Sequence, residues 1–477
     1  MIIMSRENPQ FQAGEPSNNL VKSLPKGPIV AWYGDDFTGA AAVMEVLTFS
    51  GLPSMLFLEP PTPQQLAQHQ GLKGIGVAST ARAHSPEWMS DELPRVFSTL
   101  EALKPELIHY KICTTLDSSP STGSIGRVLE IAVNSFNPRV IPILVAAPQM
   151  QRYQIFGHLF AGVGDQVYRL DRHPVMARHP VTPMDESDVA QHIAKQTELI
   201  EVSALKHDAL SIGNELMTAY DSPSDSKVSA ITLDSWDDAS ETKAGRLIWE
   251  NRRHNRFVVG SQGVEFALVR HWQETGVLPI QPPVGSVGRA SQMVTISGSV
   301  SPTTADQIAW SLENGFAGIT FDATKACGEQ SCLEAEESRV VSAALIALSK
   351  GEDPLIYTAS GPDDLAVKRF YKALERTGSD SKVTNRKIGE ALGRVLRNIL
   401  QETEVRRVVV SGGDTSGYAT QQLGIFALTA LAPTIPGASI FRAHAENSMD
   451  GLEIALKGGQ MGSPDYFGWI RDGGGER

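Results

Sequence analysis

The sequence has little cysteine and no long hydrophobic run, and each shortage excludes a class of protein. The 477 residues include three cysteines, Cys113, Cys327 and Cys332, without a C-x-x-C pair, which excludes a disulfide framework and argues against a zinc site. The longest apolar run, Val140 to Ala147, is too short to cross a bilayer. Residues 1–28 lack the apolar core of a signal peptide, so we expect a cytoplasmic protein.

Positive charge is also scarce. The 42 Lys and Arg against 54 Asp and Glu give a formal net charge of −12, which argues against a nucleic-acid partner and against a membrane surface. A small anionic substrate remains compatible with this charge if its site is locally positive. The chain contains no Gly-Lys dipeptide and therefore no Walker A loop, and it contains no H-E-x-x-H metal motif.

The pattern of hydrophobic residues predicts the fold class. Hydrophobic residues make up 41% of the chain and charged residues 20%, which is sufficient for a buried core. Short apolar runs alternate with segments of helical period, and this predicts an α/β protein of mainly parallel sheets flanked by helices. The predicted strands are Ile29–Tyr33, Ser54–Leu58, Gly74–Ser79, Leu107–Ile112, Val140–Ala147, Arg256–Gly260, Met293–Ser297, Ala317–Phe321, Leu355–Thr358 and Arg407–Ser411. Predicted helices include Pro183–Ser203, Glu336–Ser349 and Asn385–Glu404.

One stretch indicates a domain boundary. Residues 278–288 are rich in Pro and Gly, lack charge and show no period of either element. We therefore predict a flexible tail over 1–28, a first domain over 29–271, a linker over 272–291 and a second domain over 292–477. A long surface loop within a single domain is the alternative.

Two adjacent acids follow the first predicted strand. In Tyr33-Gly-Asp-Asp-Phe-Thr-Gly-Ala40 the strand runs through Gly34 into Asp35 and Asp36, and a helix of small residues follows. A helix N-terminus stabilises negative charge, and an Asp there can accept a proton from a substrate hydroxyl or hold a metal. Helix capping alone would explain one of the two acids. The adjacent spacing differs from the D-x-D-x-T pattern of haloacid-dehalogenase phosphatases, which counts against a phospho-aspartyl mechanism.

Cations and hydroxyls follow two further strands. Arg82 comes after the third predicted strand, and Lys111 ends the fourth, ahead of a polar segment that contains Thr114 and Asp117. Arg grips a carboxylate with two hydrogen bonds, Lys adds a point charge, and Thr and Asp bind hydroxyls, so the set suits a small polyhydroxy anion. An ordered polar loop is the alternative for each residue taken singly.

A separate stretch, Arg169 to Pro180, is dense in Arg and His and contains two His-Pro pairs. Proline breaks the helical spacing that a two-histidine metal site needs. We expect an ordered loop near the site or at a subunit contact, and a purely structural hydrogen-bonded loop explains the pattern as well.

The second predicted domain carries three glycine-rich segments, Ile296–Thr304, Val410–Gly417 and Leu456–Gly462. Glycine lets backbone N–H groups approach phosphate oxygens, and Ser and Thr hydroxyls supplement them at a helix N-terminus. Ordinary turn chemistry is the alternative for any one segment. The candidate nucleotide-binding residues are Ser297, Ser299, Gly412, Gly413, Asp414, Thr415, Ser416, Gly458 and Gly459.

These motifs resemble those of the four-carbon acid sugar kinases. The segment at Tyr33–Ala40 resembles the family's Asp-Asp-x-Thr-Gly-Ala signature, and Gly412-Gly-Asp-Thr-Ser-Gly417 is similar to its C-terminal Gly-Gly-[Glu/Asp]-Thr-Ser-Gly. Ser297–Pro302 and Leu456–Gln460 also resemble family segments. Many members follow the lysine with Asp-Ser-Thr and later Arg-Gly, whereas this chain has Cys113-Thr-Thr-Leu-Asp-Ser-Ser119.

The resemblance implies an N-terminal substrate domain, a C-terminal ATP domain and a cleft between them. It implies an ATP- and Mg²⁺-dependent kinase that phosphorylates threonate, erythronate or an oxo-tetronate, usually at the terminal hydroxyl. Carried over, Asp35 and Asp36 match the substrate-site acids, and Arg82 and Lys111 match the cations. The nucleotide contacts match Ser299, Gly412 to Ser416 and Gly459.

We therefore expect Asp36 or Asp35 to deprotonate the attacking hydroxyl, and we expect Arg82, Lys111, Thr114 and Asp117 to bind the acid. The expected partners are the acid sugar and ATP, without nucleic acid or membrane, and a homo-oligomer is left open. The residues that hold the metal are not identified. A phosphatase or phosphomutase with an Asp nucleophile and a non-catalytic sensor of acid sugars are the alternative functions.

Overall fold

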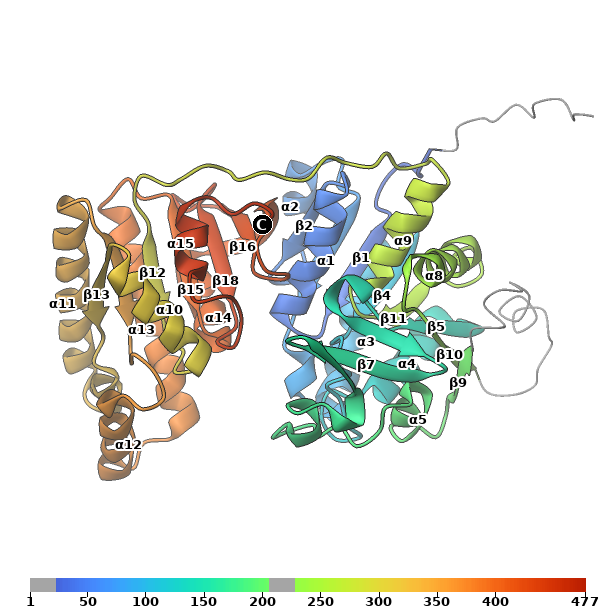
Figure 1. Ribbon diagram of the computed structural model, residues 1–477, viewed down its shortest axis with the longest axis horizontal. Coiled ribbons are helices and arrows are strands. Elements are labelled where there is room, and N and C mark those ends of the chain that lie inside the picture. Colours follow the sequence, from blue (N-terminus) through green and yellow to red (C-terminus); the bar gives the residue numbers. More distant parts are fainter. Residues whose placement is uncertain (1–22, 206–227) are drawn as a thin grey trace, which may run out of the picture.

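The structure of the chain is a computed structural model that describes residues 23–205 and 228–477. Its amino-terminal half is a parallel sheet in the order β2-β3-β1-β4-β11-β5-β10-β9, with helices on both faces (Figure 1). The strands are β1 (Val30–Gly34), β2 (Ser54–Phe57), β3 (Gly74–Ala78), β4 (Leu107–Lys111), β5 (Val140–Leu144), β9 (Glu201–Leu205), β10 (Ser229–Leu233) and β11 (Phe257–Gly260). The helices are α1 (Phe37–Phe49), α2 (Pro63–Gln68), α3 (Pro86–Ala102), α4 (Ile125–Phe136), α5 (Val189–Ala194), α8 (Asp238–Asn251) and α9 (Gly263–Glu274).

The carboxyl-terminal half contains a parallel sheet in the order β13-β14-β12-β15-β18, extended by antiparallel β17 and β16. The strands are β12 (Val294–Ser297), β13 (Phe316–Thr320), β14 (Asp353–Tyr357), β15 (Arg407–Ser411), β16 (Ile425–Ala432), β17 (Ile440–Ala445) and β18 (Glu453–Lys457). The helices are α10 (Pro302–Glu313), α11 (Gln330–Ser349), α12 (Leu365–Thr377), α13 (Ser381–Gln401), α14 (Gly413–Leu423) and α15 (Tyr466–Arg471).

The two halves share one fifteen-stranded sheet. Strand β16 pairs antiparallel with β2 through Ala427 opposite Phe57 and Leu428 opposite Leu56. On one face of the sheet, side chains of both halves form a single buried core, for example Leu47 of α1 and Leu392 of α13. Because β16 runs parallel to β18 and antiparallel to β2, the parallel strands of the two halves run in opposite directions.

The α/β prediction is confirmed, and the ten predicted strands all correspond to strands of the structure. The predicted helix over Pro183–Ser203 is wrong. Only α5 forms there, and Glu201–Leu205 pairs in parallel with β10 because its alternating side chains suit the edge of the sheet. A small antiparallel sheet was not predicted. It consists of β6 (Arg152–Ile155), β7 (His158–Val163) and β8 (Gln166–Arg169).

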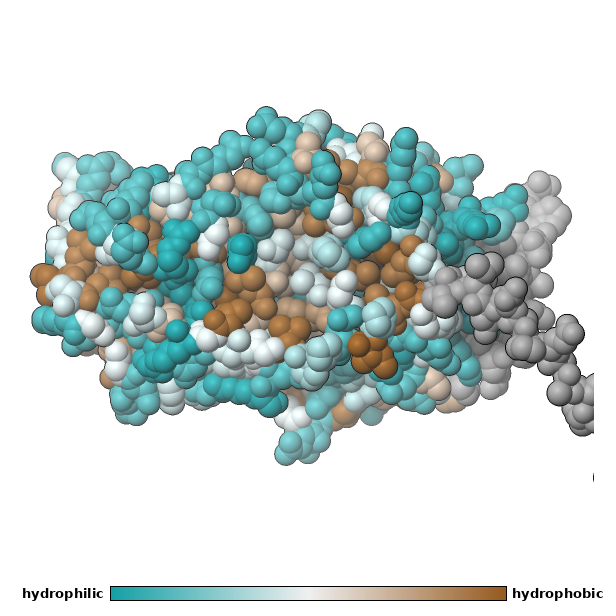
Figure 2. Space-filling view, turned by 90° about the horizontal axis from the view of Figure 1, so that it is seen from above, coloured by the Kyte–Doolittle hydropathy of each residue, from teal (hydrophilic) through white to brown (hydrophobic). Residues whose placement is uncertain are grey.

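The segment between α9 and β12, residues 275–293, contains no helix or strand and runs along one side of both halves (Figure 1). The division into domains over 29–271 and 292–477 with a linker over 272–291 stays a prediction. Most of the predicted tail, residues 1–22, lies outside the described residues. The face along which this segment runs is largely hydrophilic, with separate hydrophobic patches (Figure 2). Across the described ranges, no helix combines the length and the apolar character needed to cross a membrane.

Candidate active site

The predicted acid pair lies where β1 passes into α1. Asp36 is the N-cap of α1, and its Oδ1 accepts a hydrogen bond from Gly39 N at 3.0 Å. The Asp35 side chain is 6% exposed, whereas that of Asp36 is 29% exposed. Asp36 is thus the acid that a ligand can reach, and Asp35 lies behind it.

Arg82 binds both acids. Its Nε and Nη2 donate to the two oxygens of Asp35 at 3.2 and 2.8 Å, and Nη2 also donates to Asp36 Oδ1 at 2.8 Å. A third carboxylate, that of Asp117, places its Oδ2 3.8 Å from Nη1. Burial raises the pKa of Asp35 above its ordinary value, and the guanidinium opposes that rise. Burial lowers the pKa of Arg82, but the charge of Asp35 outweighs this effect. The pKa of Arg82 therefore lies well above its ordinary value. Most of the hydrogen-bonding capacity of Arg82 is therefore used within this acid cluster.

Lys111 ends β4 beside the same cluster. Its side chain is buried, and its Nζ donates to Ile112 O at 2.7 Å. A Cβ on Gly39 would lie 2.5 Å from Lys111 Nζ, so the glycine makes room for the ammonium group. Lys111 forms no ion pair with any residue that the structure describes, which leaves its charge available to a ligand.

The polar segment after Lys111 forms a tight loop. Cys113 Sγ lies 3.0 Å from Thr115 Oγ1, and Leu116 adopts a left-handed φ of 57°. Asp117 Oδ1 is buried without a hydrogen-bond partner among the described atoms. Thr114 is half-buried, and its hydroxyl forms no hydrogen bond within the described chain. The structure thus places all four predicted acid-binding residues, Arg82, Lys111, Thr114 and Asp117, beyond the carboxyl ends of β3 and β4, the two strands that flank β1.

In the second half, the glycine-rich turns after β12 and β18 lie side by side. Ser301 donates a hydrogen bond to Gly459 O, and Thr304 Oγ1 donates to the same carbonyl at 2.9 Å. A Cβ on Gly459 would collide with Ser299 Oγ. Ser297, the last residue of β12, is fully buried beneath this turn. Ser299, Gly458 and Gly459 therefore share one surface.

The third glycine-rich turn adjoins this surface. Gly412 adopts a φ of 119°, and α14 begins after it without a side-chain cap, so the first N–H groups of the helix have no side-chain acceptor. A Cβ on Gly298 would collide with Thr415 Oγ1, which brings the turn after β12 against α14. Ser416 instead turns inward and donates to Gly412 O at 2.8 Å. The N-terminus of α14 is consequently suited to phosphate oxygens.

Sequence reasoning missed a buried cation in this half. Lys457 ends β18, and its Nζ donates to Gly458 O at 3.0 Å and to Thr304 Oγ1 at 3.4 Å. It has no carboxylate partner among the described residues, and burial lowers its pKa to about 8. A bound phosphate would supply the missing negative charge. The Lys-Gly-Gly spacing marked the turn, but it did not indicate that the lysine is buried.

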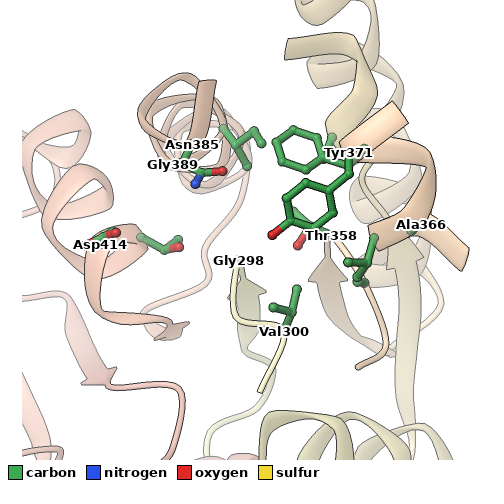
Figure 3. Close-up of a pocket in the computed structure, with 14 residues that line it drawn as sticks. Gly298, Val300, Thr358, Ala366, Tyr371, Asn385, Gly389 and Asp414 are labelled. Atoms are coloured by element: carbon green, nitrogen blue, oxygen red, sulfur yellow. The ribbon is translucent and has the colours of Figure 1, made fainter. Parts of the chain in front are cut away.

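A cavity of about 220 Å³ lies next to α14 (Figure 3). Tyr371 of α12 and Thr358 after β14 line one side, Asp414 lines the other, and Gly298 lies between them (Figure 3). The apolar part of the wall consists of Val300, Ala323, Ala359, Ala366, Val367, Phe370 and Ile388. These residues were also missed, although an aromatic pair on an amphipathic helix, Phe370-Tyr371, was visible in the sequence. The cavity is suited to a flat apolar group such as a nucleobase.

A second cavity, of about 620 Å³, lies between the two halves. Phe37, Ser79 and Thr80 line it next to the acid cluster, and Gly413 and Asp414 line it from α14. Asp414 lines both cavities, so both reach the first turn of α14.

A metal would depend on a ligand for most of its coordination. Within residues 23–205 and 228–477, no group of three or more His, Cys, Asp or Glu side chains is placed to hold a metal ion. Mg²⁺ typically binds through one or two carboxylates together with substrate phosphates. Two carboxylates, Glu59 and Asp414, line the larger cavity, and Asp414 also lines the smaller one.

Comparisons with known proteins agree with this two-part site. The chain matches a sugar-binding N-terminal domain over residues 30–268 and a nucleotide-binding C-terminal domain over residues 294–467. It is 41% identical to a 3-oxo-isoapionate kinase of Paraburkholderia graminis, over 97% of this chain and 98% of that protein. It is 27% identical to a 3-oxo-tetronate kinase of Pseudomonas savastanoi pv. phaseolicola, over 92% and 96%. A solved structure from Salmonella typhimurium LT2, 23% identical, shares the fold with a TM-score of 0.72 over 93% of this chain and 98% of its own.

Proposed function

We propose, from the premise that the chain belongs to the four-carbon acid sugar kinase family, that it transfers the terminal phosphoryl group of ATP to a hydroxyl of a short sugar acid. As a member of that family it is a carbohydrate kinase. One observation supports this reaction best: turns next to the acid cluster and the N-terminus of α14 line the same cavity. Phosphoryl transfer depends mainly on positioning and charge neutralisation, which two facing surfaces supply.

On the sugar side, Asp36 is the proposed catalytic base. It is the more exposed acid, and its Oδ2 has no hydrogen-bond partner in the described chain, so this oxygen is free to accept the proton of the attacking hydroxyl. Asp35 acts as a positioning residue, because its two oxygens hold Arg82 and Arg82 in turn holds Asp36. Lys111, Thr114 and Asp117 contact the acid substrate in this proposal.

On the nucleotide side, Lys457 and the free N–H groups of α14 hold the phosphates, and the cavity beside Tyr371 takes the base. Six of the predicted nucleotide contacts fit around them: Ser299, Gly412, Gly413, Thr415, Gly458 and Gly459. The other two, Ser297 and Ser416, are buried and support the turns from within, since Ser416 Oγ donates to Gly412 O. Asp414 would hold Mg²⁺ against the phosphates, where the ion neutralises charge that develops during transfer.

The substrate class follows from the named relatives. We propose a 3-oxo sugar acid, and we place 3-oxo-isoapionate ahead of 3-oxo-tetronate because the relative named for it is 41% identical rather than 27%. Threonate and erythronate, predicted from the resemblance, remain candidates. We also propose a cytoplasmic location, where ATP is available. Whether the chain forms a homo-oligomer stays a prediction.

The test is ADP release by the purified protein with Mg-ATP and a panel of 3-oxo-isoapionate, 3-oxo-tetronates, threonates and erythronates. We expect release that depends strictly on one of the 3-oxo acids. Release with none of them, while ATP still binds, would refute the proposed acceptor class. ATP-independent hydrolysis of a sugar phosphate by the same preparation would favour a phosphatase instead.

A further inference from the structure

Arg152, at the start of β6, is a cation for which the proposed reaction has so far no role. Its Nη1 donates to three backbone carbonyls, of Met150 at 3.0 Å, Gln151 at 3.1 Å and Gly162 at 3.2 Å. Its Nε is buried and has no acceptor among the described atoms, and the side chain forms no ion pair in the described chain. The Nη1 edge of the guanidinium therefore holds the β6–β7 hairpin, and the Nε edge lacks an acceptor.

His173 presents a second buried donor of the same kind. Its Nδ1 accepts hydrogen bonds from Val175 N at 3.2 Å and Met176 N at 3.1 Å, which places the ring hydrogen of the neutral imidazole on Nε2. That Nε2 is buried without an acceptor in the described chain, and the whole residue is 5% exposed. Buried N–H groups are normally paired, so two such donors indicate a ligand oxygen.

The two donors are neighbours, and they adjoin the acid cluster. Burial lowers the pKa of His173, and the charge of Arg152 lowers it further, so the ring is a neutral donor. Burial likewise lowers the pKa of Arg152, and the nearby thiol of Cys113 opposes that effect. Burial raises the pKa of the Cys113 thiol, and the charges of Arg82, Lys111 and Asp36 also shift it. Cys113 is therefore near both Arg152 and the acid cluster.

The backbone supports the same placement. Ala147, three residues after β5, exchanges two hydrogen bonds with Arg152, at 2.9 and 3.2 Å, which anchors the start of β6 above the carboxyl end of β5. Strand β5 neighbours β11, and β11 neighbours β4, whose last residue is Lys111. Carboxyl ends of parallel strands form one edge, so Arg152 extends the binding surface beyond Lys111.

We propose that Arg152 and His173 hold the carboxylate of the acid substrate, with the reacting hydroxyl directed to Asp36, and that Arg152 selects acids over neutral sugars. This deepens the proposed function and rests on it. Arg82, predicted to grip the carboxylate, already binds the Asp35 and Asp36 carboxylates, whereas Arg152 has a free edge that a carboxylate oxygen can accept from. Lys111 contributes the adjoining positive charge.

The test compares an acid with its neutral counterpart. Steady-state kinetics would be measured with the 3-oxo acid that the wild type turns over and with the ketose that carries a hydroxymethyl group in place of its carboxylate. For 3-oxo-tetronate this ketose is erythrulose. For Arg152→Gln we expect kcat/KM with the acid to fall about 100-fold, mostly through KM, because a charged hydrogen bond is lost. We expect little change with the ketose, so the preference for acid collapses. Arg152→Lys should recover part of the preference, and His173→Leu should repeat the loss more weakly.

Arg406 provides a matched control. Its guanidinium also donates to backbone carbonyls, of Ser448 at 3.1 Å and Asp450 at 2.6 Å, but far from the acid cluster. Arg406→Gln should leave the preference for acid unchanged. Equal losses with acid and ketose in Arg152→Gln would identify a structural clamp and overturn the proposal.

The proposal and the kinase reaction fail in different ways. If the wild type turns over no acid, the proposed kinase reaction is wrong. In that case titration calorimetry would measure the affinity of the wild type and of Arg152→Gln for threonate, which tests the carboxylate site without turnover. Weaker threonate binding by Arg152→Gln than by wild type would still support the site. Equal binding by the two, or none by either, would overturn it.

Discussion

Two buried lysines, Lys111 in the first half and Lys457 in the second, occupy equivalent positions with opposite surroundings. Each ends a parallel strand, and each donates to the carbonyl of the residue that follows it, at 2.7 and 3.0 Å. Near Lys111 lie the carboxylates of Asp35 and Asp36, although both are already paired with Arg82. Around Lys457 lie a threonine hydroxyl and glycine-rich backbone, with no carboxylate partner among the described residues.

These surroundings determine what each lysine is suited to bind. Lys457 lacks a negative partner, and burial lowers its pKa to about 8, so a phosphate would restore the stability of its charged form. Near Lys111 the acids already supply negative charge. A site with both signs orients a ligand that has an anionic end and a hydroxyl end, which describes a sugar acid. The same local geometry thus serves two substrates, because the surrounding side chains differ.

The largest effect should come from the acid that only the first half possesses. Asp36→Asn keeps an N-cap acceptor for Gly39 N but removes the proton acceptor, so we expect kcat to fall about 10³-fold. ATP binding, measured by calorimetry, should be unchanged. Asp188→Asn is the matched control, because Asp188 caps α5 through Gln191 N. Wild-type turnover in Asp36→Asn would remove Asp36 from the reaction.

Exchanging the lysines for methionine separates the two halves directly. Lys111→Met should raise KM for the acid about 10- to 100-fold and leave KM for ATP nearly unchanged, since a charged hydrogen bond is lost on one side only. Lys457→Met should raise KM for ATP and leave KM for the acid nearly unchanged. The readout is the crossed pattern of two KM values in two variants. If both variants raised the same KM, the assignment of one substrate to each half would be wrong.

Only part of the acid cluster could be predicted from the sequence. The acids, Arg82 and Lys111 were predicted to lie together, because short polar motifs after successive parallel strands meet at one edge of a sheet. That Arg82 would be bound by Asp35 and Asp36 was not predicted, since an arginine and a distant acid pair carry no sign of mutual contact in the chain.

Other features could not be predicted, because long-range packing decides them. The β2–β16 pair joins strands about 370 residues apart through two residue pairs, and no local pattern specifies it. Lys457 is buried next to Thr304, which lies 153 residues before it in the chain. The helix expected over Pro183–Ser203 failed because pairing of Glu201–Leu205 with β10 outweighed its weak helical period.

A smaller effect tests the backbone surface of the second half. In Gly459→Ala the new Cβ would collide with Ser299 Oγ, so we expect KM for ATP to rise about tenfold, as a loss of roughly one hydrogen bond would give. In Gly413→Ala the Cβ meets no protein atom within 4 Å, so thermal stability should be unchanged while ATP binding weakens. Gly285→Ala, also in open space, controls for the substitution itself. Unaltered ATP binding in both Gly459→Ala and Gly413→Ala would place the phosphates elsewhere.

The smallest effect concerns a polar contact between the halves. Glu45 of α1 is buried, and its two oxygens accept hydrogen bonds from Gly437 N at 2.8 Å and Ser439 N at 3.2 Å, in the turn between β16 and β17. Burial raises the pKa of Glu45 from 4.5 to about 7, and these two hydrogen bonds limit the rise. The same helix carries Asp36 at its other end, so this contact connects the second half to the catalytic helix.

The sign of the pH effect follows from proton binding. Between pH 4.5 and about 7 the folded chain binds a proton at Glu45 that the unfolded chain has lost, so the free energy of unfolding decreases as pH rises through this window. Glu45→Gln lacks the titrating group, so its stability relative to wild type should improve from pH 5 to pH 8. Urea unfolding of both proteins at several pH values measures this slope, even if Gln loses one of the two hydrogen bonds at every pH. Parallel stability profiles would mean that Glu45 does not titrate in this range, and the two halves would then be joined by a contact that pH does not alter.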